Sequence, residues 1–194
     1  MRHFGMARVA CLVLALACGT PGLARAASVG GVTLPDTYPV GGQTLVLNGA
    51  GVRTLTIFNV KVYAAALYLP QRSASGPAAT GAPGPKVVLL HFLHAASKSD
   101  IDKHYRDGEA RNCGHGECDR SDEADFERLI AATPAAAVGD TLTYIVTPRG
   151  LRALFNTREI ADIPNPDLGQ RILAGFIGPT PPSQDLKRQL LGQP

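Results

Sequence analysis

The chain has 194 residues and a formal net charge of +3, but three of its 19 basic side chains and none of its 16 acidic ones lie in the first 26 residues. The remainder therefore carries 16 basic and 16 acidic side chains, which excludes the clustered basic excess that a nucleic-acid-binding surface requires. Residues 27–194 are long enough for one domain with a sizeable core.

Residues 1–26 are predicted to be a secretory signal peptide. Arg2 and Arg8 supply a positive start, residues 9–17 form an apolar run, and residues 24–26 have the small-x-small pattern of a cleavage site. The apolar run is too short to span a bilayer. We therefore expect an exported protein whose mature part is a single domain.

A lipoprotein modified at Cys18 is a second interpretation of this leader. It is the weaker one, because Ala15 stands where such leaders usually have a larger aliphatic residue. No second hydrophobic run of spanning length follows, so a periplasmic or secreted protein without stable membrane insertion is expected after cleavage.

The predicted domain, residues 27–194, begins with a loop or short strand at 28–40 and continues into a long β-hairpin at 43–69. Apolar residues dominate both arms of this hairpin. Gly49 and Gly51 follow a strand, as glycines do in dinucleotide-binding loops, but a further strand comes next and no third glycine appears. We expect them to let the backbone kink or bulge beside a bulky neighbour.

Arg53 lies in this hairpin between two apolar runs, and the turn is expected near Phe58 and Asn59. With an odd number of residues in the loop, Arg53 and Tyr63 share one face of the sheet. With a two-residue loop they lie on opposite faces. We favour the odd loop.

The middle of the chain is predicted to contain a spacer followed by a strand. Residues 73–85 consist of Gly, Pro, Ala, Ser and Thr without periodicity, which predicts a mobile surface loop. Residues 86–93 are rich in Val and Leu and form the next strand. His91 and His94 fall on opposite faces of it, which makes them poor co-ligands of a metal ion.

Helices and a strand meander complete the domain. Ser97 or Ser99 caps a helix that runs to about Arg111, and a second helix begins near Ser121 and ends at Thr133. The elements that follow are strands at 141–147, 151–155 and 159–163, a helix at 166–177 and a short helix at 184–191. This order predicts an α+β fold in which helices pack on one antiparallel sheet.

Cys113 and Cys118 are the cysteines of the mature part, and a small-loop disulfide between them is expected in an oxidising compartment. The intervening His115 raises the alternative of a transition-metal site. That set lacks a fourth ligand and the C-x-x-C spacing, so the metal site is less favoured, and free thiols are the third possibility. We expect no cofactor.

The sequence lacks the common catalytic motifs of hydrolases, zinc proteases and phosphate-binding loops. Arg53 is the residue that most needs an explanation, because burying an unpaired guanidinium costs several kcal/mol and the group cannot lose its charge. It must pair with a carboxylate of the chain, reach water, or bind an anion in an apolar pocket.

Residues 45–53 (LVLNGAGVR) and 62–69 (VYAAALYL) resemble the chalcone isomerase superfamily, above all its exported bacterial chalcone isomerase-like branch. Tyr105 and, seven residues later, Asn112 are similar to a Tyr and an Asn on one helix of the plant isomerases. Weaker matches follow in order as far as residue 192.

The resemblance implies an open-faced β-sandwich with helices on one face of an antiparallel sheet and a ligand cleft between them. In the isomerases the residue matching Arg53 holds the substrate's phenolate oxygen, the one matching Tyr105 polarises the ketone through water, and the one matching Asn112 contacts the other ring. In the fatty-acid-binding members, residues matching Arg53 and Tyr63 hold a carboxylate.

Two departures from the isomerase pattern bear on catalysis. Tyr63 stands where isomerases have a small Thr that orders the catalytic water, and Gly175 stands where they have Thr or Ser. Loss of both hydroxyls removes preorganised donors, on which electrostatic catalysis depends. An arginine with a tyrosine hydroxyl suits a bound carboxylate instead. Gly175 and Phe176 are expected in the wall of the same pocket.

The preferred hypothesis is an exported, non-catalytic protein that binds a small amphipathic or aromatic anion, such as a fatty acid. Arg53 would be the anchor, Tyr63 and Tyr105 supporting donors, and Asn112 a polar group of the pocket wall. The first alternative is an intramolecular lyase that converts a chalcone to a flavanone, with Arg53, Tyr105 and Asn112 as catalytic residues. The second is a periplasmic interaction module without a ligand.

Overall fold

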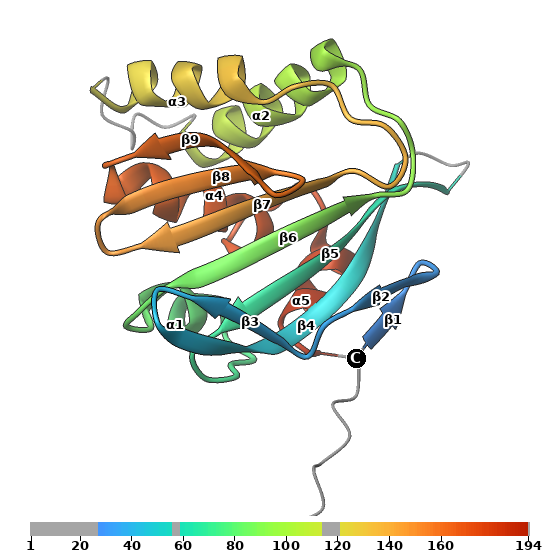
Figure 1. Ribbon diagram of the computed structural model, residues 1–194, viewed down its shortest axis with the longest axis vertical. Coiled ribbons are helices and arrows are strands. Elements are labelled where there is room, and N and C mark those ends of the chain that lie inside the picture. Colours follow the sequence, from blue (N-terminus) through green and yellow to red (C-terminus); the bar gives the residue numbers. More distant parts are fainter. Residues whose placement is uncertain (1–26, 56–58, 114–120, 194) are drawn as a thin grey trace, which may run out of the picture.

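The computed structural model describes residues 27–55, 59–113 and 121–193. Its main element is an antiparallel sheet in which every strand pairs with its neighbour in the sequence (Figure 1). The strands of this sheet are β3 (Thr37–Val40), β4 (Gln43–Leu55), β5 (Val60–Leu69), β6 (Lys86–Phe92), β7 (Thr141–Thr147), β8 (Gly150–Phe155) and β9 (Arg158–Ile163). A small hairpin precedes them and consists of β1 (Ala27–Val29) and β2 (Val32–Leu34).

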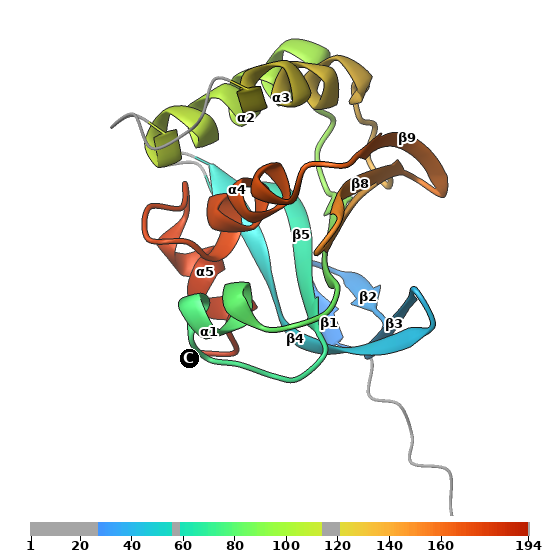
Figure 2. The ribbon, with the colours of Figure 1, turned by 90° about the vertical axis from the view of Figure 1, so that its left-hand side faces the viewer.

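The helices are α1 (Gly76–Gly81), α2 (Lys98–Cys113), α3 (Ser121–Ala132), α4 (Pro166–Ile177) and α5 (Gln184–Leu190). The sheet curls, and α4 and α5 lie against its inner side (Figure 2). Helix α4 contacts β7 and β8, α5 contacts β4, and α2 packs on α3 and α4. The predicted α+β fold, an antiparallel sheet with helices on one face, is confirmed.

Side-chain alternation along the central strands separates two cores. On β5, Ala65 and Leu67 belong to the large core between the sheet and the helices, whereas Ala66 and Tyr68 face the other side. The smaller core on that other side also contains Leu34 of β2, so the N-terminal hairpin helps to cover it. The helix-covered face is therefore the one that can hold a buried site.

Residues 76–81 correct one expectation, because they form helix α1 where a surface loop was predicted. The hydroxyl of Ser75 accepts a hydrogen bond from the backbone N–H of Ala78 at 3.3 Å, and Pro77 occupies the first turn. Ala79 is fully buried, and Gly76 lies against the backbone of Ile177. Packing on α4 thus stabilises a helix too short and too weakly patterned to be detected from sequence.

The predicted kink at the glycines of β4 is confirmed. A register shift falls between Leu47 and Gly49, and the bulged residue Asn48 donates from Nδ2 to the carbonyls of Leu190, at 2.7 Å, and Ser73, at 3.0 Å. The C-terminal end of α5 approaches β4 so closely here that a Cβ on Gly49 would lie 2.2 Å from the carbonyl oxygen of Gln189. The bulky neighbour is a helix end.

Arg53 and Tyr63 are direct cross-strand partners and so share a face, as predicted. The reason differs from the expected one. Four residues, 56–59, lie between the last paired residues, Leu55 and Val60, so the loop has an even number of residues. On β5, however, Val62 is a bulge residue with no partner on β4. This bulge restores the common face that an odd loop would have produced.

Candidate ligand-binding cleft

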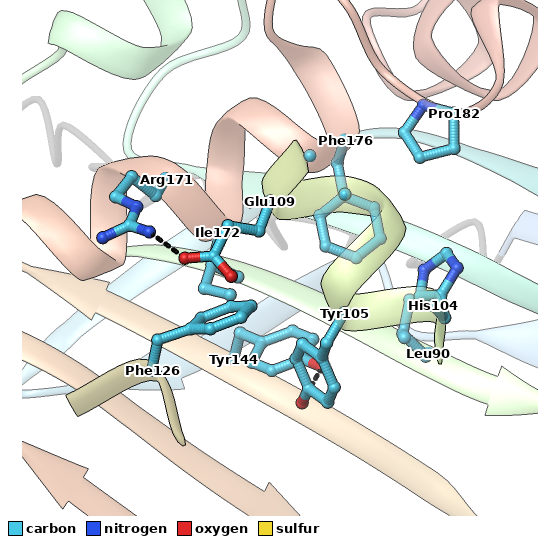
Figure 3. A pocket seen from close by; sticks show the side chains of 12 residues that line it. Leu90, His104, Tyr105, Glu109, Phe126, Tyr144, Arg171, Ile172, Phe176 and Pro182 are labelled. Carbon is cyan, nitrogen blue, oxygen red and sulfur yellow. Dashed lines mark hydrogen bonds and ion pairs between the residues drawn. The ribbon is translucent and has the colours of Figure 1, made fainter. Parts of the chain in front are cut away.

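Two cavities that share four lining residues lie side by side on the helix-covered face, one between the sheet and α2 and the other between the sheet, α2, α3 and α4, and they are called the two lobes of the cleft. The Arg53 lobe is lined by Arg53, Tyr63, Phe92, Ile101 and Leu142, among others. The Phe176 lobe, which Figure 3 shows, is lined by Glu109, Phe126, Arg171, Gly175 and Phe176, among others. The cavities measure about 100 Å³ in the Arg53 lobe and about 60 Å³ in the Phe176 lobe, and the space grows to about 570 and 560 Å³ when the open solvent at their mouths is included. The residues that line both lobes are Leu90, His104, Tyr105 and Tyr144.

The sheet positions the polar end of the cleft. Arg53 on β4 pairs with Tyr63 on β5, which in turn pairs with Phe92 on β6, so the three side chains form a row on the helix-covered face. Helix α2 crosses this row and contributes Ile101 and His104 to the same lobe. Its i, i+3 spacing places both residues on one face.

Arg53 is half-buried, and most of its guanidinium donors are available to a ligand. Its Nη1 donates to the carbonyl of the neighbouring Thr54 at 3.1 Å, and in the described part of the chain no carboxylate forms an ion pair with it. Asp100 lines the same lobe, but its Oδ2 accepts from the Ser97 hydroxyl, at 2.6 Å, and from the Ser97 backbone N–H, at 3.1 Å. These hydrogen bonds lower the pKa of Asp100, which serves as a helix-capping residue.

Tyr63 supplies a second unused donor beside the guanidinium. The side chain is 5% exposed, and its hydroxyl has no hydrogen-bond partner among the residues that the structure describes. Burial raises the pKa of Tyr63 to about 12, and the charge of Arg53 opposes part of that rise. The hydroxyl therefore keeps its proton at neutral pH and can donate it to an anion held by Arg53.

Tyr105 lies in the wall between the lobes, in a network that already uses its proton. Its hydroxyl is 2.5 Å from the hydroxyl of Tyr144 and 3.1 Å from that of Thr133, and Thr133 donates its own proton to the carbonyl of Leu129 at 2.9 Å. Thr133 therefore accepts from Tyr105, and Tyr105 accepts from Tyr144. The two tyrosines present oxygen lone pairs, so Tyr105 could donate to a ligand only by breaking its bond to Thr133.

Of the remaining predicted site residues, two line the second lobe and one has a side chain outside the described residues. Phe176 is buried in the wall of the second lobe, with its ring centroid 6.1 Å from that of Tyr144, and Gly175 lines the same lobe with open space where a Cβ would be. Asn112 lies in the last turn of α2, but its side chain is outside the described residues. The predicted Cys113–Cys118 disulfide also lies outside them.

Sequence reasoning missed three polar residues of the cleft. His104 lines both lobes, and Glu109 and Arg171 form an ion pair of 2.6 Å in the wall of the second (Figure 3). The guanidinium of Arg171 also lies 5.6 Å from the ring centroid of Phe126. Helical spacing from Tyr105 could have indicated Glu109, one turn further on, but nothing in the sequence pairs α2 with α4.

No group of three or more His, Cys, Asp or Glu side chains in the described ranges is arranged to hold a metal ion. Across residues 27–55, 59–113 and 121–193, no helix combines the length and apolar character needed to cross a bilayer.

Fold and cleft together define an α+β protein whose curled antiparallel sheet carries, on its helix-covered face, an apolar cleft with an arginine at one end. The family model described as chalcone isomerase-like matches residues 26–192, and the chain belongs to this family. The resemblance inferred from residues 45–69 is confirmed. A sequence comparison with curated proteins finds no match.

Solved structures with a similar fold include a fatty-acid binding protein of Arabidopsis thaliana, with a TM-score of 0.66 and 15% sequence identity. The match covers 83% of this chain and 92% of that one. At this level of identity the likeness shows a shared fold.

Proposed function

We propose that the protein binds a small amphipathic or aromatic anion, such as a fatty acid, and does not convert it. The observation that carries this proposal is the pair of unused donors in the Arg53 lobe. Arg53 has no ion-pair partner in the described part of the chain, and the adjacent Tyr63 hydroxyl has no hydrogen-bond partner there. A charged fork with one further donor is complementary to a carboxylate.

The rest of the cleft suits an apolar tail. Beyond the Arg53–Tyr63 pair, the walls are mainly aliphatic and aromatic, and they continue past Tyr105 and Tyr144 into the Phe176 lobe. The family membership and the fold shared with a fatty-acid binding protein support the same class of ligand. The anion would thus lie beside Arg53 with its tail toward α4.

The hydrogen-bond donors of the cleft favour binding over turnover. A lyase that closes a ring onto an enone needs a donor for the developing negative charge on the ketone oxygen. In this cleft the proton of Tyr105 is directed at Thr133, and the position of the water-ordering Thr is occupied by Tyr63. Neither residue reproduces the arrangement that the resemblance implies for the isomerases, in which a Tyr polarises the ketone through a water molecule ordered by a Thr.

Extraction of bound small molecules tests the proposed function. Protein purified without detergent is denatured in organic solvent, and the extract is analysed by mass spectrometry beside an extract of Arg53→Ala prepared in parallel. We expect a carboxylic amphipath at a substantial molar fraction of the wild-type protein and a clear loss in the variant. Recovery of no anionic amphipath from wild type, or equal recovery from both, would count against the proposal.

We also propose, from the leader alone, that the protein is exported and cleaved after Ala26. N-terminal sequencing of the protein from its native host would identify the mature start. A start at Ala27 supports cleavage, and an intact residue 1 contradicts it.

A further inference from the structure

His104 is a polar ring at the junction of the two lobes. It lines both cavities, and its ring stands edge-on to that of Tyr63 with centroids 6.3 Å apart. Within the described residues neither ring nitrogen has a hydrogen-bond partner. The residue is exposed to solvent, so protons can reach it.

The charges around His104 oppose its protonation in the empty cleft. Partial desolvation of the imidazole by the side chains packed around it lowers the pKa of His104 below its ordinary value, and the charge of Arg53 lowers it further. On its own helix, Asp107 raises this pKa and Arg111 lowers it. The other charged or titratable groups that line the same two lobes are Asp100, Tyr63, Tyr105, Tyr144 and the Glu109–Arg171 pair.

A bound anion changes this balance in one direction. A carboxylate beside Arg53 would neutralise the positive charge that most lowers the pKa of His104 and would add a negative charge to the lobe that His104 lines. Both changes favour the imidazolium form. The neutral ring of the free protein would then become a third donor, after Arg53 and Tyr63, when the ligand is present.

We propose that His104 contacts the bound ligand and takes up a proton when an anion occupies the Arg53 lobe. This inference rests on the proposed function. Because the complex favours the protonated form of His104, binding takes up a proton. Binding must therefore tighten as the pH falls toward the pKa of His104 in the free protein. Between the pKa of His104 in the complex and its lower pKa in the free protein, the Kd should fall by up to about tenfold for each unit by which the pH is lowered, the limit for one linked proton.

Isothermal titration calorimetry with dodecanoate tests the proposal. Binding is measured at pH 6.0 and pH 8.0 in two buffers of different ionisation enthalpy, which yields the number of protons exchanged. We expect net proton uptake at pH 6.0 by the wild type, little at pH 8.0, and none beyond that of the ligand itself in His104→Gln. His94→Gln is the matched control, because His94 is exposed and outside both lobes, and it should retain the uptake.

The outcomes separate the two proposals. No binding of dodecanoate by the wild type at either pH overturns the proposed function, and this inference with it. Binding without proton uptake, or with equal uptake in wild type and His104→Gln, overturns the role of His104 alone. Independently of any ligand, NMR titration should show a higher pKa for His104 in Arg53→Gln than in wild type, and an unchanged or lower value would contradict the account.

Discussion

Replacing Arg53 with alanine is expected to raise the Kd for a fluorescent fatty acid by about 10- to 100-fold. Hydrogen bonds to charged groups contribute about 1.5–3 kcal/mol each, and 1.4 kcal/mol corresponds to a tenfold change in Kd. The variant also leaves the ligand's carboxylate facing an apolar cavity without a counter-charge. Direct titration with a naturally fluorescent polyene fatty acid at neutral pH measures this loss.

Lys61→Ala is the matched control for that experiment. Lys61 lies on β5 close to Tyr63, is exposed, and does not line either lobe, so its removal changes the net charge equally but leaves the cleft intact. We expect its Kd to stay close to that of the wild type. Arg53→Lys should fall between, because an ammonium keeps the charge but not the fork.

The stability of Arg53→Ala separates binding from a structural role. The side chain makes one hydrogen bond, to the carbonyl of Thr54, and in the described part of the chain forms no ion pair whose loss would strand a buried carboxylate. Its free energy of unfolding should therefore change by no more than about 0.5–1 kcal/mol without ligand. A large loss of stability in Arg53→Ala, together with no fatty-acid binding by the wild type, would favour the interaction-module alternative.

Gly49→Ala is expected to lower the free energy of unfolding by about 2–3 kcal/mol or more, the upper range for overpacking a rigid site. The new Cβ would lie 2.2 Å from the carbonyl oxygen of Gln189 and 2.6 Å from that of Leu190. Both atoms are backbone, and Asn48 already holds the Leu190 carbonyl by a hydrogen bond of 2.7 Å. The helix end cannot retreat without breaking this link, and urea unfolding measures the cost.

Gly175→Ala is the matched control for Gly49→Ala. Gly175 lies in α4, and a Cβ built there meets nothing within 4 Å. Alanine is the better helix former by about 1 kcal/mol, so this variant should be as stable as wild type or more so. If Gly49→Ala were as stable as Gly175→Ala, the close approach of α5 to β4 would be contradicted.

Much of the fold was predictable because each local signal agreed with its neighbours. Asn165 caps α4 and Ser183 caps α5 through their side chains, and both helices begin where the sequence predicts. The meander from Thr141 to Ile163 follows from short apolar runs separated by turn residues such as Gly150 and Asn156. Such elements need no knowledge of distant contacts.

The loop expected at residues 76–81 and the odd hairpin loop were predicted wrongly, for two different reasons. Helix α1 exists because Ala79 and Gly76 pack against the C-terminal half of the chain. The common face of Arg53 and Tyr63 depends on a bulge at Val62 that no residue type announces.

The site was predictable in its anchor and less so in its donors. Arg53 could be singled out because a cation between apolar runs demands a partner, and the structure places it in the cleft beside Tyr63. Tyr105 donates its proton to Thr133 because α2 contacts the end of α3, which the sequence does not reveal. Nothing in the sequence indicated that His104, which precedes Tyr105, lines the cleft.

The most direct test of the account is the titration of a bound carboxylate. A long-chain fatty acid labelled with ¹³C at its carboxyl carbon is bound to the protein, and its chemical shift is followed by NMR as the pH is lowered. An adjacent positive charge lowers the pKa of a carboxyl group, whereas apolar burial raises it. We predict a pKa below that of the free acid in wild type and above it in Arg53→Ala; the same pKa in both proteins would contradict the claim that Arg53 holds the anion.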